Sequence, residues 1–230
     1  MNNTKLSIIV DKLINMFEEN NNVVGRGTTS VVFIKDKNTV SKMFNSSFDY
    51  FKERTIMFHI NYINNNLFNS IKMITFNNSE KTIDYAYIPY NLEQILSNSN
   101  YYILNNEQTY NIIISIIKSL ESLHNNYIIH GDFKSKNIQL TEKLEPYIID
   151  FGLSRIDETK EMFNILKRDD IDKLWYIIIQ LILKIDYRRS YKNIKNNLKK
   201  IEENHAVLCG IYNKKKYDLN SIKKYFISLL

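Results

Sequence analysis

Two carboxylates and an amide flank a predicted β-hairpin in the second half of the chain. Asp132 and Asn137 lie in a polar loop, and Asp150 opens the tripeptide D-F-G thirteen residues after Asn137. The apolar runs Ile138–Leu140 and Tyr147–Ile149 lie between the two loops, separated by a polar turn. This pattern predicts a loop, a tight hairpin and a second loop, so the three polar side chains converge at one end of the hairpin.

Phosphoryl transfer is the chemistry that needs such a set of side chains. One carboxylate orients an attacking hydroxyl or accepts its proton, and a second carboxylate and an amide oxygen hold Mg²⁺ against a triphosphate. The alternative interpretation is an ordinary polar loop followed by a chance D-F-G. We prefer phosphoryl transfer, because further segments that this chemistry requires occur upstream in the expected order.

The composition fits a globular protein of one domain or two compact lobes. The chain has 230 residues, of which 44% are hydrophobic and 24% charged, both ordinary values. A single cysteine, Cys209, excludes an intramolecular disulfide and a zinc cluster. The late apolar run Ile177–Leu183 is too short to span a membrane. The net charge of +6 has two interpretations: binding of acidic partners, or a basic, solvated surface that binds no partner.

The first ninety residues predict a helix followed by strands. Residues 5–19 have helical periodicity, and we expect this segment to pack on the first lobe or to bind a partner. Apolar residues then flank Gly25 and Gly27, and Thr39–Phe44 forms a return strand after a polar turn. The remaining predicted elements are a short helix over Asp49–Met57 and strands over Ile71–Phe76 and Thr82–Ile88.

The rest of the chain predicts helices around the hairpin. Gln108–Asn126 has a broad apolar face, and a second apolar helix opens near Ile171 and runs to about Ile185. A mostly polar stretch separates this second helix from Gly152. Near the C-terminus, basic residues accumulate; they are Arg188, Arg189, Lys192, Lys195, Lys199, Lys200, Lys214–Lys216, Lys223 and Lys224.

The loop His130-Gly131-Asp132 through Asn137, followed by D-F-G, resembles the catalytic loop and metal-binding motif of the protein kinase superfamily. The resemblance covers about residues 20–185. It implies an α+β, bilobal kinase-like fold. The N-lobe, residues 1–90, would hold a small antiparallel β-sheet, and residues 91–230 would form a mainly helical, shortened C-lobe.

The resemblance also implies a role for each site residue. Asp132 would orient the substrate hydroxyl and accept its proton, and Lys134 would neutralise charge on the transferring phosphate. Asn137 and Asp150 would bind Mg²⁺, and ATP would be the phosphoryl donor. The residues implied to bind the nucleotide are Gly25, Gly27, Ser30, Val32, Lys42, Glu53 and Tyr90.

Some of these assignments depend on neighbouring sequence. Lys42 would contact the phosphates, and Glu53, the only acid between residues 50 and 79, is the best candidate for its ion-pair partner. His124 and His130 are expected to form structural hydrogen bonds. Asp170 is expected either to bind the catalytic-loop backbone, as the resemblance implies, or to cap an ordinary helix.

Several departures from the kinase pattern point to compact relatives. Gly131 replaces the Arg of H-R-D, no A-P-E follows, and Asp170 lies close behind Gly152. These features resemble the small kinase of the KEOPS complex and small-molecule phosphotransferases. Lys134, in contrast, is typical of Ser/Thr protein kinases. The phrase Arg168–Ile171 resembles the casein kinase 1 and vaccinia-related branch.

We therefore expect a Ser/Thr protein kinase that uses ATP and Mg²⁺ to phosphorylate a protein hydroxyl. The alternatives are a KEOPS-like kinase or ATPase, a small-molecule phosphotransferase and an inactive nucleotide-binding scaffold. The basic C-terminal region predicts either a solvated surface or an acidic or nucleic-acid partner. The expected location is intracellular and cytoplasmic, which includes the cytoplasm of a virus-infected host cell.

Overall fold

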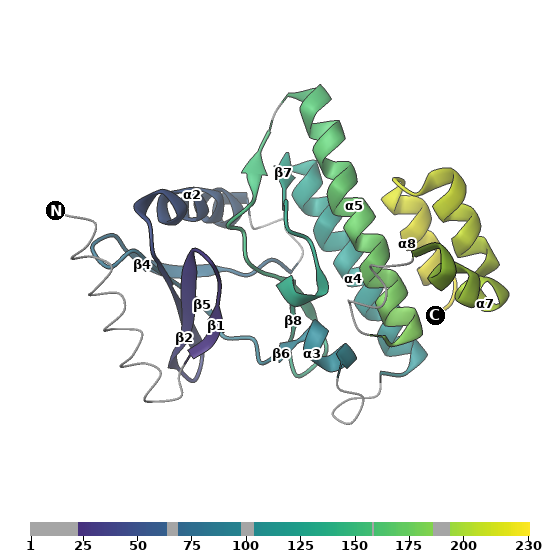
Figure 1. Ribbon diagram of the computed structural model, residues 1–230, viewed down its shortest axis with the longest axis horizontal. Helices are drawn as coiled ribbons and strands as arrows, with labels where there is room; N and C mark the ends of the chain where they lie inside the picture. The colour runs from purple at the N-terminus through teal and green to yellow at the C-terminus, as the bar shows by residue number, and fades with distance from the viewer. Residues whose placement is uncertain (1–22, 64–68, 98–103, 158, 186–193) are drawn as a thin grey trace. The chain divides into compact units, whose positions relative to one another are not determined.

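A computed structural model describes residues 23–63, 69–97, 104–157, 159–185 and 194–230. The predicted helix over residues 5–19 lies outside these ranges. The chain divides into two compact units (Figure 1). The first contains Met1–Ile63 and Ile71–Ile88, and the second contains Asn64–Ser70 and Pro89–Leu230.

The first unit is built on an antiparallel sheet whose strands follow the order β1-β2-β3-β5-β4. The strands are β1 (Val23–Arg26), β2 (Ser30–Asp36), β3 (Thr39–Phe44), β4 (Met73–Asn77) and β5 (Thr82–Ala86). Alternating side chains of β2 and β3 point to the same face, where Val31, Phe33 and Met43 form a buried cluster.

Helix α2 (Ser47–Ile63) packs against β3 and β4 and is longer than the predicted Asp49–Met57 segment. It buries one face, formed by Tyr50, Glu53, Ile56, Met57 and Ile60. Glu53 is the only charged residue among them, so a cationic partner must compensate its burial. The sheet supplies that partner, as described below.

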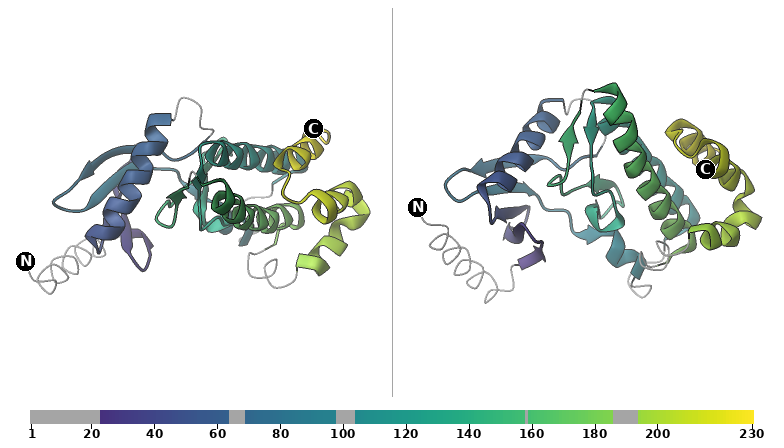
Figure 2. Two further views of the ribbon diagram at one scale, coloured as in Figure 1. Left: turned by 90° about the horizontal axis from the view of Figure 1, so that it is seen from above. Right: turned by 45° about the horizontal axis from the view of Figure 1, so that its top comes forward.

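The second unit is mainly helical. Helices α4 (Asn106–Asn125) and α5 (Lys160–Leu183) lie side by side in both views of Figure 2 and contact each other. A capping box fixes the start of α4, because the Asn105 side chain accepts from the Gln108 backbone and the Gln108 side chain accepts from the Asn105 backbone. The other helices are α3 (Leu92–Ser97), α7 (Ile194–Lys215) and α8 (Leu219–Ile227).

The predicted hairpin is present in the second unit. Strand β8 (Ile138–Leu140) pairs with β9 (Pro146–Ile148), and the short strand β6 (Tyr90–Asn91) joins on the other side of β8. A second ribbon pairs β7 (Ile128–Ile129) with β10 (Arg155–Ile156). The two ribbons hold the segments before and after the D-F-G tripeptide. Together with the sheet and helices, they confirm the predicted α+β fold class.

The helix expected to open near Ile171 begins eleven residues earlier, at Lys160. The prediction was wrong because residues 160–169 are mostly polar, although Lys, Glu, Met and Leu are good helix formers. Phe163 anchors this polar part, since it is buried and packs edge-on against the rings of His124 and Tyr127.

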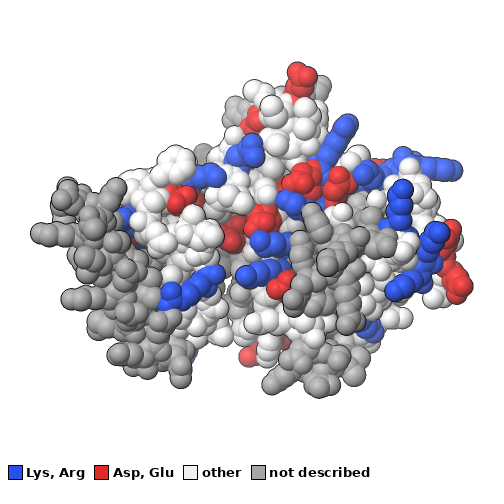
Figure 3. All heavy atoms as spheres, viewed as in Figure 1, with Lys and Arg blue, Asp and Glu red and all other residues white. Residues whose placement is uncertain are grey.

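The basic C-terminal residues belong partly to α7, which carries Lys195, Lys199 and Lys200. Arg188, Arg189 and Lys192 lie outside the described residues. On the face shown in Figure 3, basic side chains stand among acidic ones, and α7 itself includes Glu202 and Glu203. A nucleic-acid or acidic partner stays a prediction. None of the helices in the described ranges is both long and apolar enough to span a membrane.

Candidate active site

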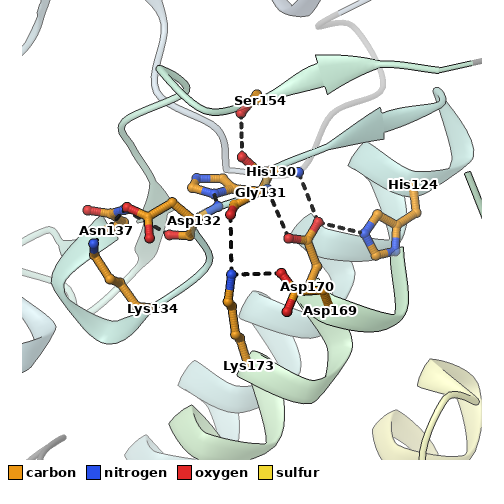
Figure 4. A network of polar contacts seen from close by, with 10 residues as sticks. All are labelled: His124, His130, Gly131, Asp132, Lys134, Asn137, Ser154, Asp169, Asp170 and Lys173. Carbon is orange, nitrogen blue, oxygen red and sulfur yellow. Dashed lines mark hydrogen bonds and ion pairs between the residues drawn. The ribbon is translucent and has the colours of Figure 1, made fainter. Parts of the chain in front are cut away.

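The polar loop after β7 brings Asp132, Lys134 and Asn137 together (Figure 4). Lys134 Nζ lies 2.6 Å from Asp132 Oδ2, and Asn137 Nδ2 donates to the same oxygen at 3.0 Å. Asn137 Nδ2 also donates to the Asp132 carbonyl at 2.8 Å. Two donors therefore fix the Asp132 carboxylate on one oxygen, while its side chain stays 27% exposed.

The loop is anchored by His130, which is fully buried. The His130 ring packs against Phe133 and Phe151. Its Nε2 lies 3.0 Å from the Ile149 carbonyl, and its Nδ1 accepts the backbone N–H of Asp132 at 3.2 Å. Nδ1 must be unprotonated to accept, so this geometry selects the neutral ring with its proton on Nε2. Burial lowers the pKa of His130, although the nearby Asp170 charge opposes this effect.

Asp170 holds the same loop from α5. Its carboxylate accepts the backbone N–H groups of His130 (2.9 Å) and Gly131 (3.0 Å), and its Oδ2 lies 3.1 Å from His124 Nε2. Burial acts to raise the pKa of Asp170, but the hydrogen bonds from His124 and from the backbone of His130 oppose burial, and the pKa is lowered. Asp170 lies well inside α5, so it binds the loop backbone and does not cap the helix.

Asp150 lies at the same end of the hairpin as Asn137. The backbone N–H of Ile149 donates to the Asn137 carbonyl at 3.0 Å, which ties the two loops together. Asp150 is exposed and has a φ of 64°, a conformation that Asp tolerates better than most residues. A strained backbone of this kind is common where a side chain must be aimed at a ligand.

The donor set of this loop pair fits Mg²⁺. Asn137 uses its amide nitrogen for both contacts with Asp132, so its amide oxygen is outside those contacts, and Asp150 adds a carboxylate. Within the described ranges, no group of three His, Cys, Asp or Glu side chains could hold a metal. Mg²⁺ is usually bound by one or two carboxylates together with phosphates and waters, not by an all-protein cage.

The first unit contains the predicted lysine–glutamate pair. Lys42 Nζ on β3 lies 2.7 and 2.9 Å from the two carboxylate oxygens of Glu53 on α2. The hydroxyl of Tyr85 on β5 donates to Glu53 Oε1 at 2.8 Å. The side chains of Lys42 and Glu53 are only 9% and 2% exposed. Their ion pair is therefore buried and locked by a third group.

The glycine-rich segment forms the turn between β1 and β2. Gly25 pairs with Val32 across the two strands, and the N–H of Gly27 donates to the Ser30 carbonyl at 2.9 Å. Tyr90 lies in β6 of the second unit and is 41% exposed. The nucleotide-binding roles of these residues stay predictions.

Three residues with clear contacts at the site were not predicted. Tyr85 holds Glu53, Ser154 Oγ donates to the His130 carbonyl at 2.8 Å, and Lys173 Nζ donates to the Gly131 carbonyl at 3.2 Å. The sequence carried a signal only for Lys173, which follows Asp169 at the i,i+4 spacing of a helical ion pair. That signal indicates a helix pair and says nothing of Gly131.

The sequence of this chain is similar to those of known protein kinases. Residues 18–177 match the protein kinase domain. A 97-residue stretch is 34% identical to a protein of Acanthamoeba polyphaga mimivirus named as a serine/threonine-protein kinase, covering 42% of this chain and 17% of the relative. A stretch of 165 residues is 26% identical to Mitogen-activated protein kinase 4 of Oryza sativa subsp. japonica, covering 71% of this chain and 43% of the relative.

A third relative is Cysteine-rich receptor-like protein kinase 1 of Arabidopsis thaliana, 48% identical over 68 residues, which cover 28% of this chain and 11% of the relative. The chain thus spans less than half the length of each of these three relatives. The match to the kinase domain extends over more than half of this chain. It includes the Lys42–Glu53 pair and the two loops that carry Asp132 and Asp150. The chain belongs to the protein kinase domain family.

Proposed function

We propose that the chain is a Ser/Thr protein kinase that transfers the γ-phosphoryl group of Mg-ATP to a protein hydroxyl. The observation that carries this proposal is the contact of Lys134 and Asn137 with one oxygen of Asp132. A loop that binds an attacking hydroxyl needs a carboxylate of fixed orientation, and these two donors provide it.

In this proposal, Asp132 receives the hydroxyl of the substrate and accepts its proton. Its second oxygen, Oδ1, is outside the contacts with Lys134 and Asn137. Lys134 is 33% exposed, so its ammonium is accessible to the negative charge that develops on a phosphate during transfer. The buried His130 and Asp170 position the loop and take no part in proton transfer.

A protein kinase domain implies ATP and Mg²⁺ in general, and the donor set of this chain fits both. Asn137 and Asp150 would hold Mg²⁺ through oxygen atoms, and Lys42, oriented by Glu53, would hold the phosphates. When bound, Mg-ATP supplies the phosphoryl group and neutralises its charge. The protein contributes the positions of these side chains, which Tyr85 and the Asn137 backbone help to fix.

The name of the mimivirus relative and the presence of Lys134 support the Ser/Thr assignment. Lys134 belongs to the pattern that resembles Ser/Thr kinases, and it makes the shortest contact of Asp132 at 2.6 Å. That relative matches over only 42% of the chain, so the substrate class is proposed from the catalytic loop of this chain.

One observation favours a KEOPS-like kinase or ATPase as a second candidate. Helix α5 begins at Lys160, so residues 153–159 are all that separate it from Gly152. This short segment leaves little chain to dock a peptide beside Asp132. An enzyme without a peptide groove would release phosphate to water or use a different acceptor.

The deciding experiment incubates the chain with Mg-ATP labelled in the γ-phosphate and with acidic and basic protein substrates. Label on Ser or Thr supports the proposal. Released phosphate without labelled protein supports the ATPase alternative and contradicts the protein kinase proposal. In a parallel thermal-shift assay, Mg-ATP should raise the melting temperature, because a nucleotide that binds only the folded state stabilises it. No increase would indicate a scaffold that binds no nucleotide.

A further inference from the structure

Lys173 reaches the catalytic loop from α5 and points toward Gly131, whereas Lys134 lies beside Asp132 (Figure 4). Its Nζ donates to the Gly131 carbonyl at 3.2 Å and to Asp169 Oδ2 at 2.7 Å. The side chain is 25% exposed, against 60% for Asp169. Lys173 therefore lies between a surface acid and the backbone of the residue that precedes Asp132.

Residue 131 cannot supply a cation of its own. Gly131 has a φ of 80°, and a Cβ atom placed there would lie 2.6 Å from the Leu153 carbonyl oxygen. Both the backbone conformation and the close approach of Leu153 exclude a side chain at this position. The cation beside the Gly131–Asp132 peptide belongs to another element, because it is Lys173 of α5.

The contact has a direct geometric consequence for Asp132. The Gly131 carbonyl and the Asp132 N–H belong to one planar peptide group. Lys173 holds the oxygen of this group, and His130 Nδ1 accepts its N–H at 3.2 Å. The plane that leads into Asp132 is thus held at both edges, while Asp170 accepts the N–H of Gly131 in the preceding peptide group.

The charge of Lys173 also acts on this group. Burial works to lower the pKa of the ammonium, but the hydrogen bond to Asp169 and the charges of Asp169, Asp170 and Asp132 outweigh burial and raise it. Lys173 is therefore a cation at neutral pH. A hydrogen bond from a charged donor is stronger than one between neutral groups.

We propose that Lys173 is a positioning residue that fixes the Gly131–Asp132 peptide and so sets the orientation of the Asp132 carboxylate. This inference rests on the proposed function, in which Asp132 acts on the substrate hydroxyl. The competing role is a helix pair between Asp169 and Lys173, which would stabilise α5 slightly and leave catalysis unchanged.

The test compares three single variants of the full chain: Lys173→Met, Lys173→Arg and Asp169→Ala. Lys173→Met keeps the length of the side chain and removes its donor. We expect kcat to fall roughly 10- to 100-fold, since a misplacement of about 1 Å can cost about 10²-fold, with KM for ATP unchanged. Lys173→Arg should retain most of kcat, and Asp169→Ala should stay near the wild-type value.

Amide hydrogen exchange gives a second readout that does not depend on turnover. In Lys173→Met the Asp132 N–H should exchange faster, whereas the amides of α4 should keep their protection. If wild type shows no turnover but the Asp132 N–H still exchanges faster in Lys173→Met than in wild type, the positioning role is supported and the proposed function is contradicted. Unchanged exchange and kcat in Lys173→Met would overturn the positioning role even in an active kinase.

A purely structural role gives a different pattern. If Lys173→Met and Asp169→Ala lower kcat to the same extent, and also lower the melting temperature to the same extent, Lys173 belongs to the helix pair and the proposal is overturned. If Lys173→Met is too unstable to measure, Lys173→Gln, which removes the charge and shortens the side chain, takes its place. Wild-type stability with faster Asp132 exchange and lower kcat in this variant supports the inference, and wild-type exchange with wild-type kcat overturns it.

Discussion

The two units each contain a lysine–carboxylate pair, and the surroundings of the two pairs differ sharply. Lys42 and Glu53 are 9% and 2% exposed, and Tyr85 adds a hydrogen bond to the carboxylate. Lys134 and Asp132 are 33% and 27% exposed. The charges and the short distances are similar, so burial is what separates the two pairs.

Burial decides what each pair can do. A buried pair leaves an uncompensated charge if either partner is removed, so it is a fixed part of the first unit. An open pair is screened by water, and its partners can exchange contacts at low cost. Under the proposed function, the open pair suits catalysis, in which a lysine must respond to charge that appears only during transfer. The buried pair suits the proposed orientation of the nucleotide.

The largest effect is expected for the open pair and concerns turnover. Asp132→Asn keeps the size of the side chain but removes the base, and a positioned base contributes about 10²- to 10⁴-fold. Turnover should fall by that order. The melting temperature, measured in the same samples, should change little. A large loss of stability together with turnover would show that Asp132 is a structural residue.

The buried pair should show the reverse behaviour. Lys42→Met leaves Glu53 buried without its cation, which should lower the free energy of unfolding by about 3–5 kcal/mol. Chemical denaturation of the variant measures this loss. The double variant Lys42→Met/Glu53→Leu should recover much of it, because an apolar pair of similar size removes both charges. No recovery would mean that the two residues do not act as a pair.

Acid should weaken the anchor of the catalytic loop. The pKa of His130 in the folded protein lies below its ordinary value of 6.5, so between these values the unfolded chain binds more protons. The free energy of unfolding should therefore fall as the pH drops below about 6.5. Asp170 has the same sign but acts below its ordinary pKa of 3.8.

Denaturation curves at pH 7.5 and pH 5.5 test this expectation. Burial also lowers the pKa of His205 in α7, so His205→Gln serves as the matched control for His130→Gln. In wild type and in His205→Gln, the free energy of unfolding should be lower at pH 5.5 than at pH 7.5. If it is nearly the same at both pH values in His130→Gln, the effect belongs to His130. Stability that rises on acidification would contradict the neutral ring.

The smallest effect on the free energy of unfolding should come from removing Lys134, the lysine of the open pair. Lys134→Met breaks a partly exposed ion pair, and such pairs contribute about 0–1 kcal/mol. Its free energy of unfolding should therefore lie within about 1 kcal/mol of wild type, far from the value for Lys42→Met. A loss as large as that of Lys42→Met would remove the distinction between the two pairs.

The same distinction explains what the sequence could predict. The Lys42–Glu53 pair could be inferred because Glu53 is the only acid between residues 50 and 79, and the hairpin was visible in its two apolar runs. Both depend on short-range pattern. The fold class was implied by the resemblance of the catalytic-loop motifs to protein kinases, and the periodicity of the predicted strands and helices agreed with it.

Contacts made across long stretches of chain left no such trace. Tyr85 meets Glu53 from 32 residues away, and Lys173 meets Gly131 from 42 residues away. The early start of α5 was missed because a single buried aromatic residue, Phe163, anchors ten mostly polar positions. Tertiary packing supplied what the local pattern lacked.

The most direct test of the account follows the transfer of labelled γ-phosphate to Ser and Thr in wild type and in Asp132→Asn, assayed side by side. The account predicts phosphoserine or phosphothreonine in wild type and a rate lower by about 10²- to 10⁴-fold in the variant. Equal labelling by both proteins would contradict the role of Asp132, and phosphate released only to water would contradict the protein kinase assignment.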